Sequence, residues 1–224
     1  MDYQILWNSF PSLLQGALLT LKLTALILLL GTVLAFPIAF AKNSKNLVAQ
    51  GLAHAYIGFF RGTPSLVQVF LLYYGAGQFA FIKTSFLWPV LRDPFWCIVI
   101  ALGLNSASYT GKTLAAALKA VPKGVKEAAS SLGMGKLAQF WTIDLPLSFR
   151  IALPAFSNEV ILTCKATSLA STVTLIELTG SARLLASQTY APYEAFLGAG
   201  LIYLGINYAL MTALRSVEAR LQIV

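Results

Sequence analysis

Two ionisable side chains of opposite sign, Glu159 and Lys165, lie inside an otherwise apolar stretch of the sequence. A charge at the centre of a membrane-spanning helix costs about 2.5–3.5 kcal/mol, so such residues face water or a partner helix rather than lipid. At roughly 100° per residue, Glu159 and Thr163 share one helix face, while Asn158 and Lys165 share another about a quarter turn away. One polar wall could therefore present all of these side chains.

A carboxylate in such a wall can serve two purposes. It can bind an ammonium group, and with Asn105 from a neighbouring apolar stretch Glu159 would then line a path for a solute. It can instead form an ion pair, with Lys165 or with another subunit, that only positions helices. The sequence leaves both interpretations open. The candidate path residues are Asn105, Tyr109, Asn158, Glu159, Thr163 and Lys165.

Other motifs that could bind a metal or a nucleotide are weak. His54 is the only histidine and is predicted to be a polar residue on a helix flank, so no metal site is expected. Cys97 and Cys164 fall in apolar runs, which predicts two buried thiols rather than a disulfide or a metal pair. Gly111-Lys112-Thr113 is similar to the end of a phosphate-binding loop, but the glycine required five positions earlier is Ser106. We expect this chain to bind no ATP, metal or other cofactor itself.

Composition indicates a membrane protein. Of the 224 residues, 58 % are hydrophobic and only 11 % are charged, and the mean hydropathy is +0.74. Several apolar runs approach the roughly 20 residues that a spanning helix needs. The basic residues behind the net charge of +8 lie at the ends of these apolar runs. Basic residues at such positions set membrane topology, so the positive charge does not indicate nucleic-acid binding. No basic segment precedes the first apolar run, so no cleavable signal peptide is expected.

Five membrane-spanning helices are predicted, in one all-α transmembrane domain covering residues 1–224 with a cytoplasmic loop at about 119–149. Proline removes a backbone donor, so Gly62-Thr63-Pro64 should separate a tilted or interfacial helix ending near Phe60 from the second span. The expected spans are approximately 18–41, 65–79, 95–118, 151–174 and 193–214.

Basic residues predict the orientation. Nine lie in the 42–45 and 119–150 loops and the C-terminal segment, whereas Lys83, Arg92 and Arg183 lie on the other side. Because loops rich in Lys and Arg stay inside, the 119–150 loop and the C-terminus should face the cytoplasm and the N-terminus the outside. The nine residues are Lys42, Lys45, Lys119, Lys123, Lys126, Lys136, Arg150, Arg215 and Arg220.

The 119–150 loop is expected to hold two short helices. Val125, Ala128, Ala129 and Leu132 recur at helical spacing, and Gly133 follows them where a left-handed cap is favoured. Leu137, Phe140 and Trp141 indicate a second short helix, which Pro146 should end. The first helix has a small, alanine-rich apolar face that could dock closely on a partner.

The same loop resembles the signature of bacterial ABC importer permeases: Glu-Ala-Ala, three residues, Gly, nine residues, Ile-x-Leu-Pro. Elsewhere Arg61-Gly62-Thr63-Pro64, Thr167-Ser168-Leu169 and Glu177-Leu178-Thr179 are similar to the polar amino acid permeases, close to those for histidine, basic amino acids and opines. The residues expected to contact the ATPase are Gly124, Glu127, Ala128, Ala129, Gly133, Ile143, Leu145 and Pro146.

This resemblance implies a type I permease fold and a non-enzymatic role. Two cytoplasmic ATP-binding subunits would bind ATP and Mg²⁺, a second permease subunit would complete a homo- or heterodimer, and an external or periplasmic solute-binding protein would deliver a polar amino acid across the bacterial inner membrane. Many relatives have Asp where this chain has Ala166 and Glu where it has Lys112, which leaves the identity of the amino acid open. The alternatives are a secondary transporter driven by an ion gradient and an ATP-independent channel subunit.

Overall fold

The computed structural model describes residues 3–221, with side chains from Phe10 onward. This part of the chain is helical with no strand, which confirms the all-α prediction. In chain order the elements are α1 (Tyr3–Lys42), α2 (Leu47–Gly62), α3 (Ser65–Tyr73), the 3₁₀ turn η1 (Ala76–Gln78), α4 (Ala80–Lys83), α5 (Trp88–Leu91), α6 (Pro94–Ala120), α7 (Lys123–Ser131), α8 (Lys136–Gln139), the π-helical segment η2 (Phe140–Asp144), α9 (Leu145–Ala166), the 3₁₀ segment η3 (Thr167–Val173), α10 (Leu178–Thr189) and α11 (Pro192–Leu221).

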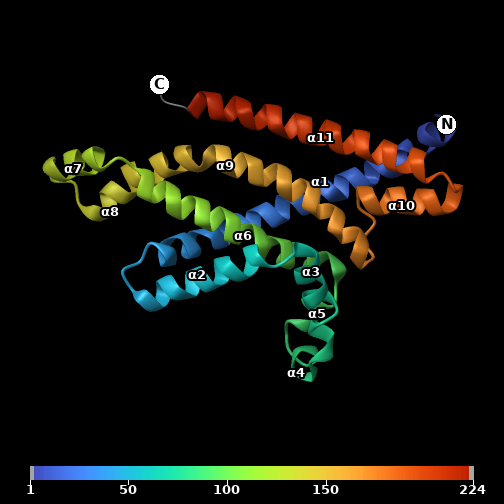
Figure 1. The fold of residues 1–224 in the computed structure, drawn as a ribbon, viewed down its shortest axis with the longest axis horizontal. Helices are drawn as coiled ribbons and strands as arrows, with labels where there is room; N and C mark the ends of the chain where they lie inside the picture. The colour runs from blue at the N-terminus through green and yellow to red at the C-terminus, as the bar shows by residue number, and fades with distance from the viewer. Residues whose placement is uncertain (1–2, 222–224) are drawn as a thin grey trace.

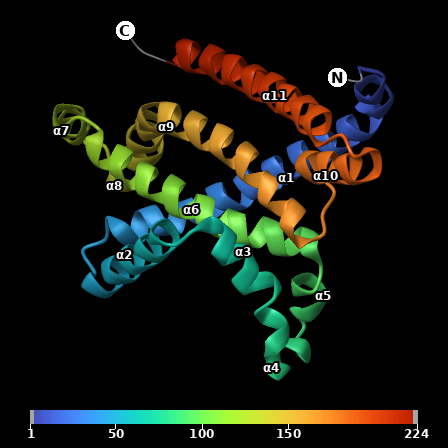
Figure 2. The ribbon, with the colours of Figure 1, turned by 45° about the vertical axis from the view of Figure 1, so that its right-hand side comes forward.

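Helices α1 and α6 form the centre of the bundle, with α9 beside α6 and α11 along the outer side (Figures 1 and 2). Small residues let α1 and α6 approach closely. A methyl group at Gly103 would lie 2.7 Å from a Leu30 methyl, and one at Gly111 would lie 2.8 Å from Ile38. Small residues at a helix interface allow this close approach of the two backbones.

The predicted second span, 65–79, is wrong as a single helix. Helix α3 ends at Tyr73, and η1, α4 and α5 then project from the bundle (Figure 2). The chain folds back at Gly75, where a Cβ atom would collide with the carbonyl oxygen of Leu71. A glycine is required there, and it ends the helix that the apolar run alone would have continued.

The prediction that Pro146 ends a second short loop helix is also wrong. α8, η2 and α9 form one continuous helical stretch that begins at Lys136. Pro146 lies in the first turn of α9, where the Leu145 N–H already bonds five residues back to the Phe140 carbonyl. A π-helical segment accommodates the missing proline donor without breaking the helix.

By length and composition, two helical segments of the described part could cross a membrane, Phe10–Lys42 and Pro192–Leu221. A third is added if Lys136–Val173 and Leu178–Thr189, which meet at 47°, form one bent span. The predicted spans at 95–118, 151–174 and 193–214 correspond to α6, to α9 with η3, and to α11. The total of five spans stays a prediction.

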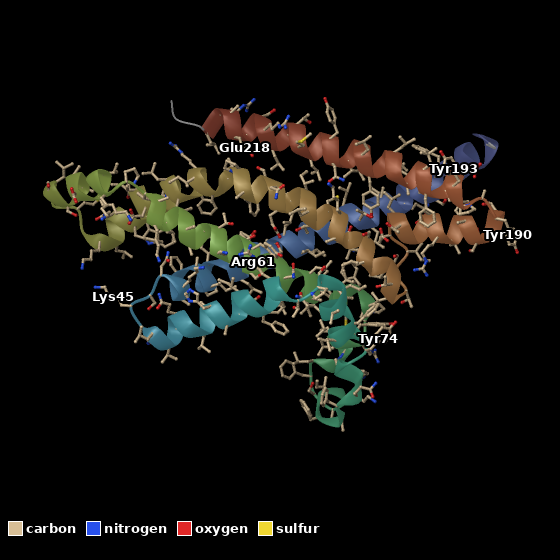
Figure 3. The ribbon with its side chains drawn as sticks, viewed as in Figure 1. Lys45, Arg61, Tyr74, Tyr190, Tyr193 and Glu218 are labelled. Atoms are coloured by element: carbon tan, nitrogen blue, oxygen red, sulfur yellow. The ribbon has the colours of Figure 1, made fainter. Side chains whose placement is uncertain are left out.

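The two ends of the bundle carry different features. Lys45, Glu218 and helices α7 and α8 lie at one end, whereas Tyr190 and Tyr193 lie at the other (Figure 3). Helix α1 begins near the tyrosine end and α11 ends near the α7 end (Figure 1). The start of the first helix and the end of the last are thus at opposite ends of the bundle.

A fully buried carboxylate, that of Glu177, joins three helices at the tyrosine end. It caps α10 by accepting hydrogen bonds from the Thr179 and Gly180 amides, at 2.8 and 3.0 Å. The hydroxyls of Tyr203 in α11 and Thr20 in α1 donate to it at 2.9 and 3.4 Å. Buried carboxylates are tolerated when they are this fully hydrogen-bonded, so Glu177 fixes the relative positions of α1, α10 and α11.

Candidate functional site

Helix α7 and the residues after it form a well-defined docking element. The helix ends at Gly133, whose φ of 77° is left-handed. The Met134 amide bonds to the Ala129 carbonyl at 3.1 Å, and the Gly133 amide bonds to the Ser130 carbonyl at 3.0 Å. This pair of bonds is a Schellman motif, which confirms the predicted glycine cap.

The outer surface of this element is apolar and unpartnered in the single chain. Leu132, Leu137 and Trp141 are 86 %, 74 % and 61 % exposed. Of the two signature alanines, Ala128 is exposed and Ala129 is buried. The remaining signature residues are half-buried or exposed, so the element offers a surface for another protein. Those residues are Gly124, Glu127, Gly133, Ile143, Leu145 and Pro146.

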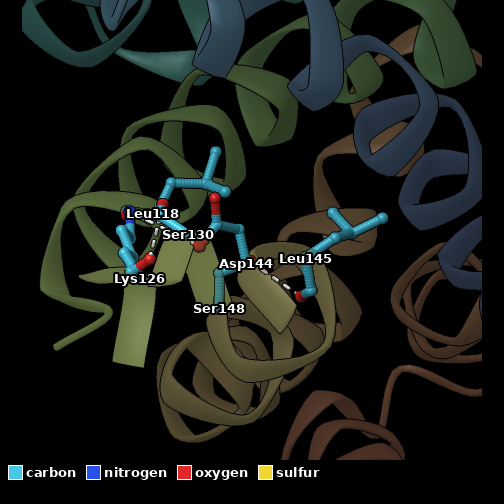
Figure 4. A network of polar contacts seen from close by, with 6 residues as sticks. All are labelled: Leu118, Lys126, Ser130, Asp144, Leu145 and Ser148. Carbon is cyan, nitrogen blue, oxygen red and sulfur yellow. Dashed lines mark hydrogen bonds and ion pairs between the residues drawn. The ribbon is translucent and has the colours of Figure 1, made fainter. Parts of the chain in front are cut away.

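An ion pair holds α7 against the continuous helix that follows. The Lys126 ammonium lies 3.5 Å from the Asp144 carboxylate and donates to the Leu118 carbonyl at 3.4 Å (Figure 4). Lys126 therefore connects the end of α6, helix α7 and the π-helical segment η2.

The second candidate site is a group of cavities between α1, α6 and α9. The largest, about 420 Å³, is lined by Tyr109, Asn158 and Glu159 among mainly apolar side chains. A neighbouring cavity of about 160 Å³ is lined by Asn105, Tyr109, Glu159 and Thr163. The structure thus brings together all the predicted path residues except Lys165, which lines neither cavity.

Glu159 has polar neighbours in α9 and α6 but no paired cation. The Thr163 hydroxyl donates to it at 3.4 Å, which confirms that the two share a helix face, and Ser106 of α6 lines the same cavity. Lys165 is exposed and forms no ion pair with Glu159 within the described residues. The intramolecular Glu159–Lys165 pair is therefore absent, because six residues place the two side chains on different faces of the helix.

Asn105 lines the smaller cavity, but its side-chain amide nitrogen already donates hydrogen bonds within the protein. It donates to the Phe60 carbonyl at 3.0 Å and to the Gln68 side-chain oxygen at 2.9 Å. Gln68 is buried and donates in turn to the Phe60 and Thr63 carbonyls at 2.9 and 3.1 Å. Asn105 thus holds the break between α2 and α3 against α6. The sequence analysis missed Gln68. The only indication of its role was a polar amide in an apolar run, four residues after Pro64.

The remaining sequence candidates have ordinary surroundings. Cys97 and Cys164 are free and fully buried, which confirms the prediction of buried thiols. His54 is exposed and bonds to the Gln50 carbonyl of its own helix at 2.8 Å. No group of metal-ligating residues occurs between residues 3 and 221.

A bundle of long apolar helices, a charged residue in cavities between the helices and an exposed docking element together define a membrane-embedded transport component. Over residues 27–223 the sequence matches the family described as binding-protein-dependent transport system inner membrane component, and the chain belongs to that family. It is therefore an inner-membrane permease component of an ABC importer, which works with ATP-binding subunits and a solute-binding protein and does not itself hydrolyse ATP.

Named relatives agree with this assignment. The octopine transport system permease protein OccM of Rhizobium radiobacter is 46 % identical over 207 residues, covering 92 % of this chain and 84 % of that protein. The arginine ABC transporter permease protein ArtM of Escherichia coli strain K12 is 40 % identical over 216 residues, covering 96 % of each chain. A solved structure described as an amino acid ABC transporter with histidines has a TM-score of 0.87 and 30 % identity, covering 98 % of this chain and 99 % of that one. The resemblance to ABC importer permeases is confirmed.

Proposed function

We propose that the chain conducts a cationic amino acid or an opine, with Glu159 binding the cationic group of the cargo. The supporting observation is that Glu159 lies in a cavity with Tyr109 and Asn158 and has no cation paired to it among the described residues. The relatives named for octopine and arginine support the cargo class, because both compounds carry a guanidinium group. A carboxylate in a partly dry cavity recognises such a group by a charge-assisted hydrogen bond.

We propose that α7 is the coupling helix and that Leu132, Leu137 and Trp141 contribute to its contact with the ATP-binding subunit. Their exposure on the single chain supports this, since apolar patches of this kind mark protein interfaces. ATP and Mg²⁺ would bind to the two partner subunits only. In this arrangement the α7 end faces the cytoplasm and the tyrosine end faces the outside.

We further propose that the whole chain acts as one permease unit within a dimer of permease subunits. Closure of the ATP-binding subunits would push α7, and Lys126 would pass the movement to α6 and α9, which line the cavities. The cavity would thereby open alternately to either side. Nucleotide binding needs only to favour one of two arrangements of the dimer.

Uptake of radiolabelled L-arginine into proteoliposomes that contain the complete importer and its solute-binding protein tests the cargo assignment. Glu159→Gln should reduce uptake at least about tenfold, as expected for the loss of one charge-assisted hydrogen bond. Glu194→Gln is the matched control. Glu194 lies in the first turn of α11 rather than in α9, and this variant should transport normally. Unchanged uptake in Glu159→Gln would remove Glu159 from the path.

Co-purification of the ATP-binding subunit tests the coupling assignment. Glu127→Lys should abolish it, whereas Glu194→Lys should not, because only Glu127 lies in the exposed part of α7. Uptake that persisted without ATP would favour a secondary transporter or a channel instead. Normal co-purification and transport by Glu127→Lys would contradict the assignment of α7.

A further inference from the structure

Two cations without an ion-pair partner among the described residues lie beside the proposed path. Arg61 at the end of α2 and Lys112 in α6 line a third cavity, of about 390 Å³. Both side chains are exposed on the single chain, and Figure 3 shows Arg61 where α2 meets the middle of the bundle. Charges at such positions face water or a partner because contact with lipid is too costly.

Neither cation forms an ion pair with a described carboxylate, although the charge of Arg61 acts on Glu159 across the cavities. The one ion pair between described residues joins Lys126 to Asp144, and neither Arg61 nor Lys112 donates a hydrogen bond to another described residue. Lys42 and Lys119 are near enough for their charges to add to the same field. This concentration of positive charge would attract a small anion, since a cavity lined by one sign of charge raises the local concentration of counter-ions.

The cation-lined cavity adjoins the proposed cargo cavities. It shares Tyr109, Thr113 and Ala152 with the largest of them, and Tyr109 also lines the small cavity around Asn105. The Arg61 guanidinium carbon lies 4.8 Å from the centroid of the Tyr109 ring, a cation–π contact that leaves the N–H donors of Arg61 available for an anion. Glu159 and Arg61 line neighbouring cavities that share Tyr109, so the path has a negative and a positive pole.

We propose that Arg61 and Lys112 form a carboxylate-binding site of the cargo path, which holds the carboxylate of an amino acid or opine while Glu159 holds its cationic group. This inference rests on the proposed function. A planar guanidinium suits a carboxylate because it offers parallel N–H donors, and a nearby ammonium adds a second charge. A phospholipid phosphate is the other anion that could enter. The shared cavity wall with Glu159 favours a zwitterionic cargo, whose two charges match the two poles.

The first test measures the local field directly. In the complete importer in phosphatidylcholine nanodiscs, Ala116→Cys places a thiol in the wall of the cation-lined cavity, and the two native cysteines are fully buried. A sulfonate methanethiosulfonate reagent should modify this thiol about tenfold faster than its trimethylammonium analogue. Adding Arg61→Gln or Lys112→Gln should weaken the preference severalfold, because Lys42 and Lys119 still contribute to the field, whereas the matched control Lys45→Gln should leave it intact. Equal modification rates before any further substitution would overturn the inference.

The second test identifies the anion. L-Arginine should slow the modification of Ala116→Cys, whereas agmatine, which lacks the carboxylate, should protect at least about tenfold less well. Arg61→Gln should abolish the difference between the two compounds. Equal protection by both compounds would overturn a carboxylate site, and protection by added phosphatidylglycerol with none by L-arginine would assign the site to lipid and overturn it as well.

Failure of the proposed function gives a different result. If Glu159 is not part of the path, Glu159→Gln will leave the protection by agmatine and L-arginine unchanged, while Arg61→Gln will still weaken protection by L-arginine alone. If the carboxylate site is wrong, Arg61→Gln will not change the relative protection given by L-arginine and agmatine. Glu159→Gln will still weaken the protection by both compounds. The two variants therefore separate the two proposals.

Discussion

The guanidinium of Arg61 lies over the ring of Tyr109, 4.8 Å from the ring centroid, at the point where the three cavities meet. This contact joins α2 to α6 and sets the position of a charge inside the bundle. A cation–π contact contributes about 0.5–2 kcal/mol, depending on how far it is desolvated. The ring of Tyr109, rather than its hydroxyl, should therefore matter for transport.

Tyr109→Leu should lower the rate of L-arginine uptake by the reconstituted importer, because Arg61 loses the surface that positions it. Tyr109→Phe keeps the ring and should transport nearly as well as the unmodified protein. Uptake and ATP hydrolysis measured together would separate a path defect from a coupling defect. Equal loss in both variants would assign the role to the hydroxyl instead.

Gly133→Ala should weaken the end of α7. Its φ of 77° costs a residue with a Cβ about 1–2 kcal/mol, although no neighbour obstructs the added methyl group. Gly135→Ala is a matched control, since Gly135 has a φ of −66° and also has no neighbour within 4 Å. Hydrogen exchange of the α7 amides should accelerate in the first variant only. Equal exchange rates in both variants would show that the cap does not hold the helix.

Lys126→Met should reduce the stimulation of ATP hydrolysis by the loaded solute-binding protein, because it disconnects α7 from η2. The partners are 34 % and 17 % exposed, so the ion pair itself is worth less than about 1 kcal/mol. A double-mutant cycle with Asp144→Asn measures their coupling. The double variant should resemble either single variant, whereas strictly additive defects would mean that the two residues act independently.

Glu177→Ala should destabilise the purified importer strongly. It removes the cap of α10 and leaves the hydroxyls of Tyr203 and Thr20 without their acceptor. Each buried group left unsatisfied costs about 1–3 kcal/mol, and the lost cap adds about 1 kcal/mol. The melting temperature should fall by far more than in Glu194→Ala, which alters a half-buried residue of α11. A similar melting temperature in both variants would show that Glu177 does not hold these helices together.

Local patterns predicted α7 and its cap correctly. Helical periodicity and a following glycine act over less than ten residues, and Gly133 adopted the left-handed conformation that this spacing favours. The boundary at Tyr73 was missed although Gly75 was visible, because a glycine ends a helix only where the chain must fold back. Pro146 did not end a helix, because the π-helical segment before it accommodates the missing backbone donor.

Pairings between distant residues could not be predicted from sequence. Glu159 and Asn105 were expected to line one path because apolar helices place charged and amide groups inward, and both do line the same cavity. No local pattern indicated that the side-chain amide of Asn105 would donate a hydrogen bond to Gln68, 37 residues away. Nor did spacing reveal that Arg61 would lie over Tyr109, because that contact depends on how α2 packs on α6.

Gln68→Leu should destabilise the break between α2 and α3. It removes one of the two acceptors of the Asn105 amide, one of the two donors to the Phe60 carbonyl and the donor to the Thr63 carbonyl, and each such hydrogen bond contributes about 0.5–1.5 kcal/mol. Because Arg61 lies at this break, the variant should also weaken the preference of Ala116→Cys for the sulfonate reagent.

Gln78→Leu provides the matched control, since the exposed Gln78 bonds only to the Tyr74 carbonyl of its own segment at 3.4 Å. Its melting temperature and its reagent preference should both stay close to those of the unmodified importer. A Gln68→Leu variant that lost stability but kept the reagent preference would mean that Tyr109 alone positions Arg61. One that kept both would show that the hydrogen bonds around Gln68 do not hold the break in place.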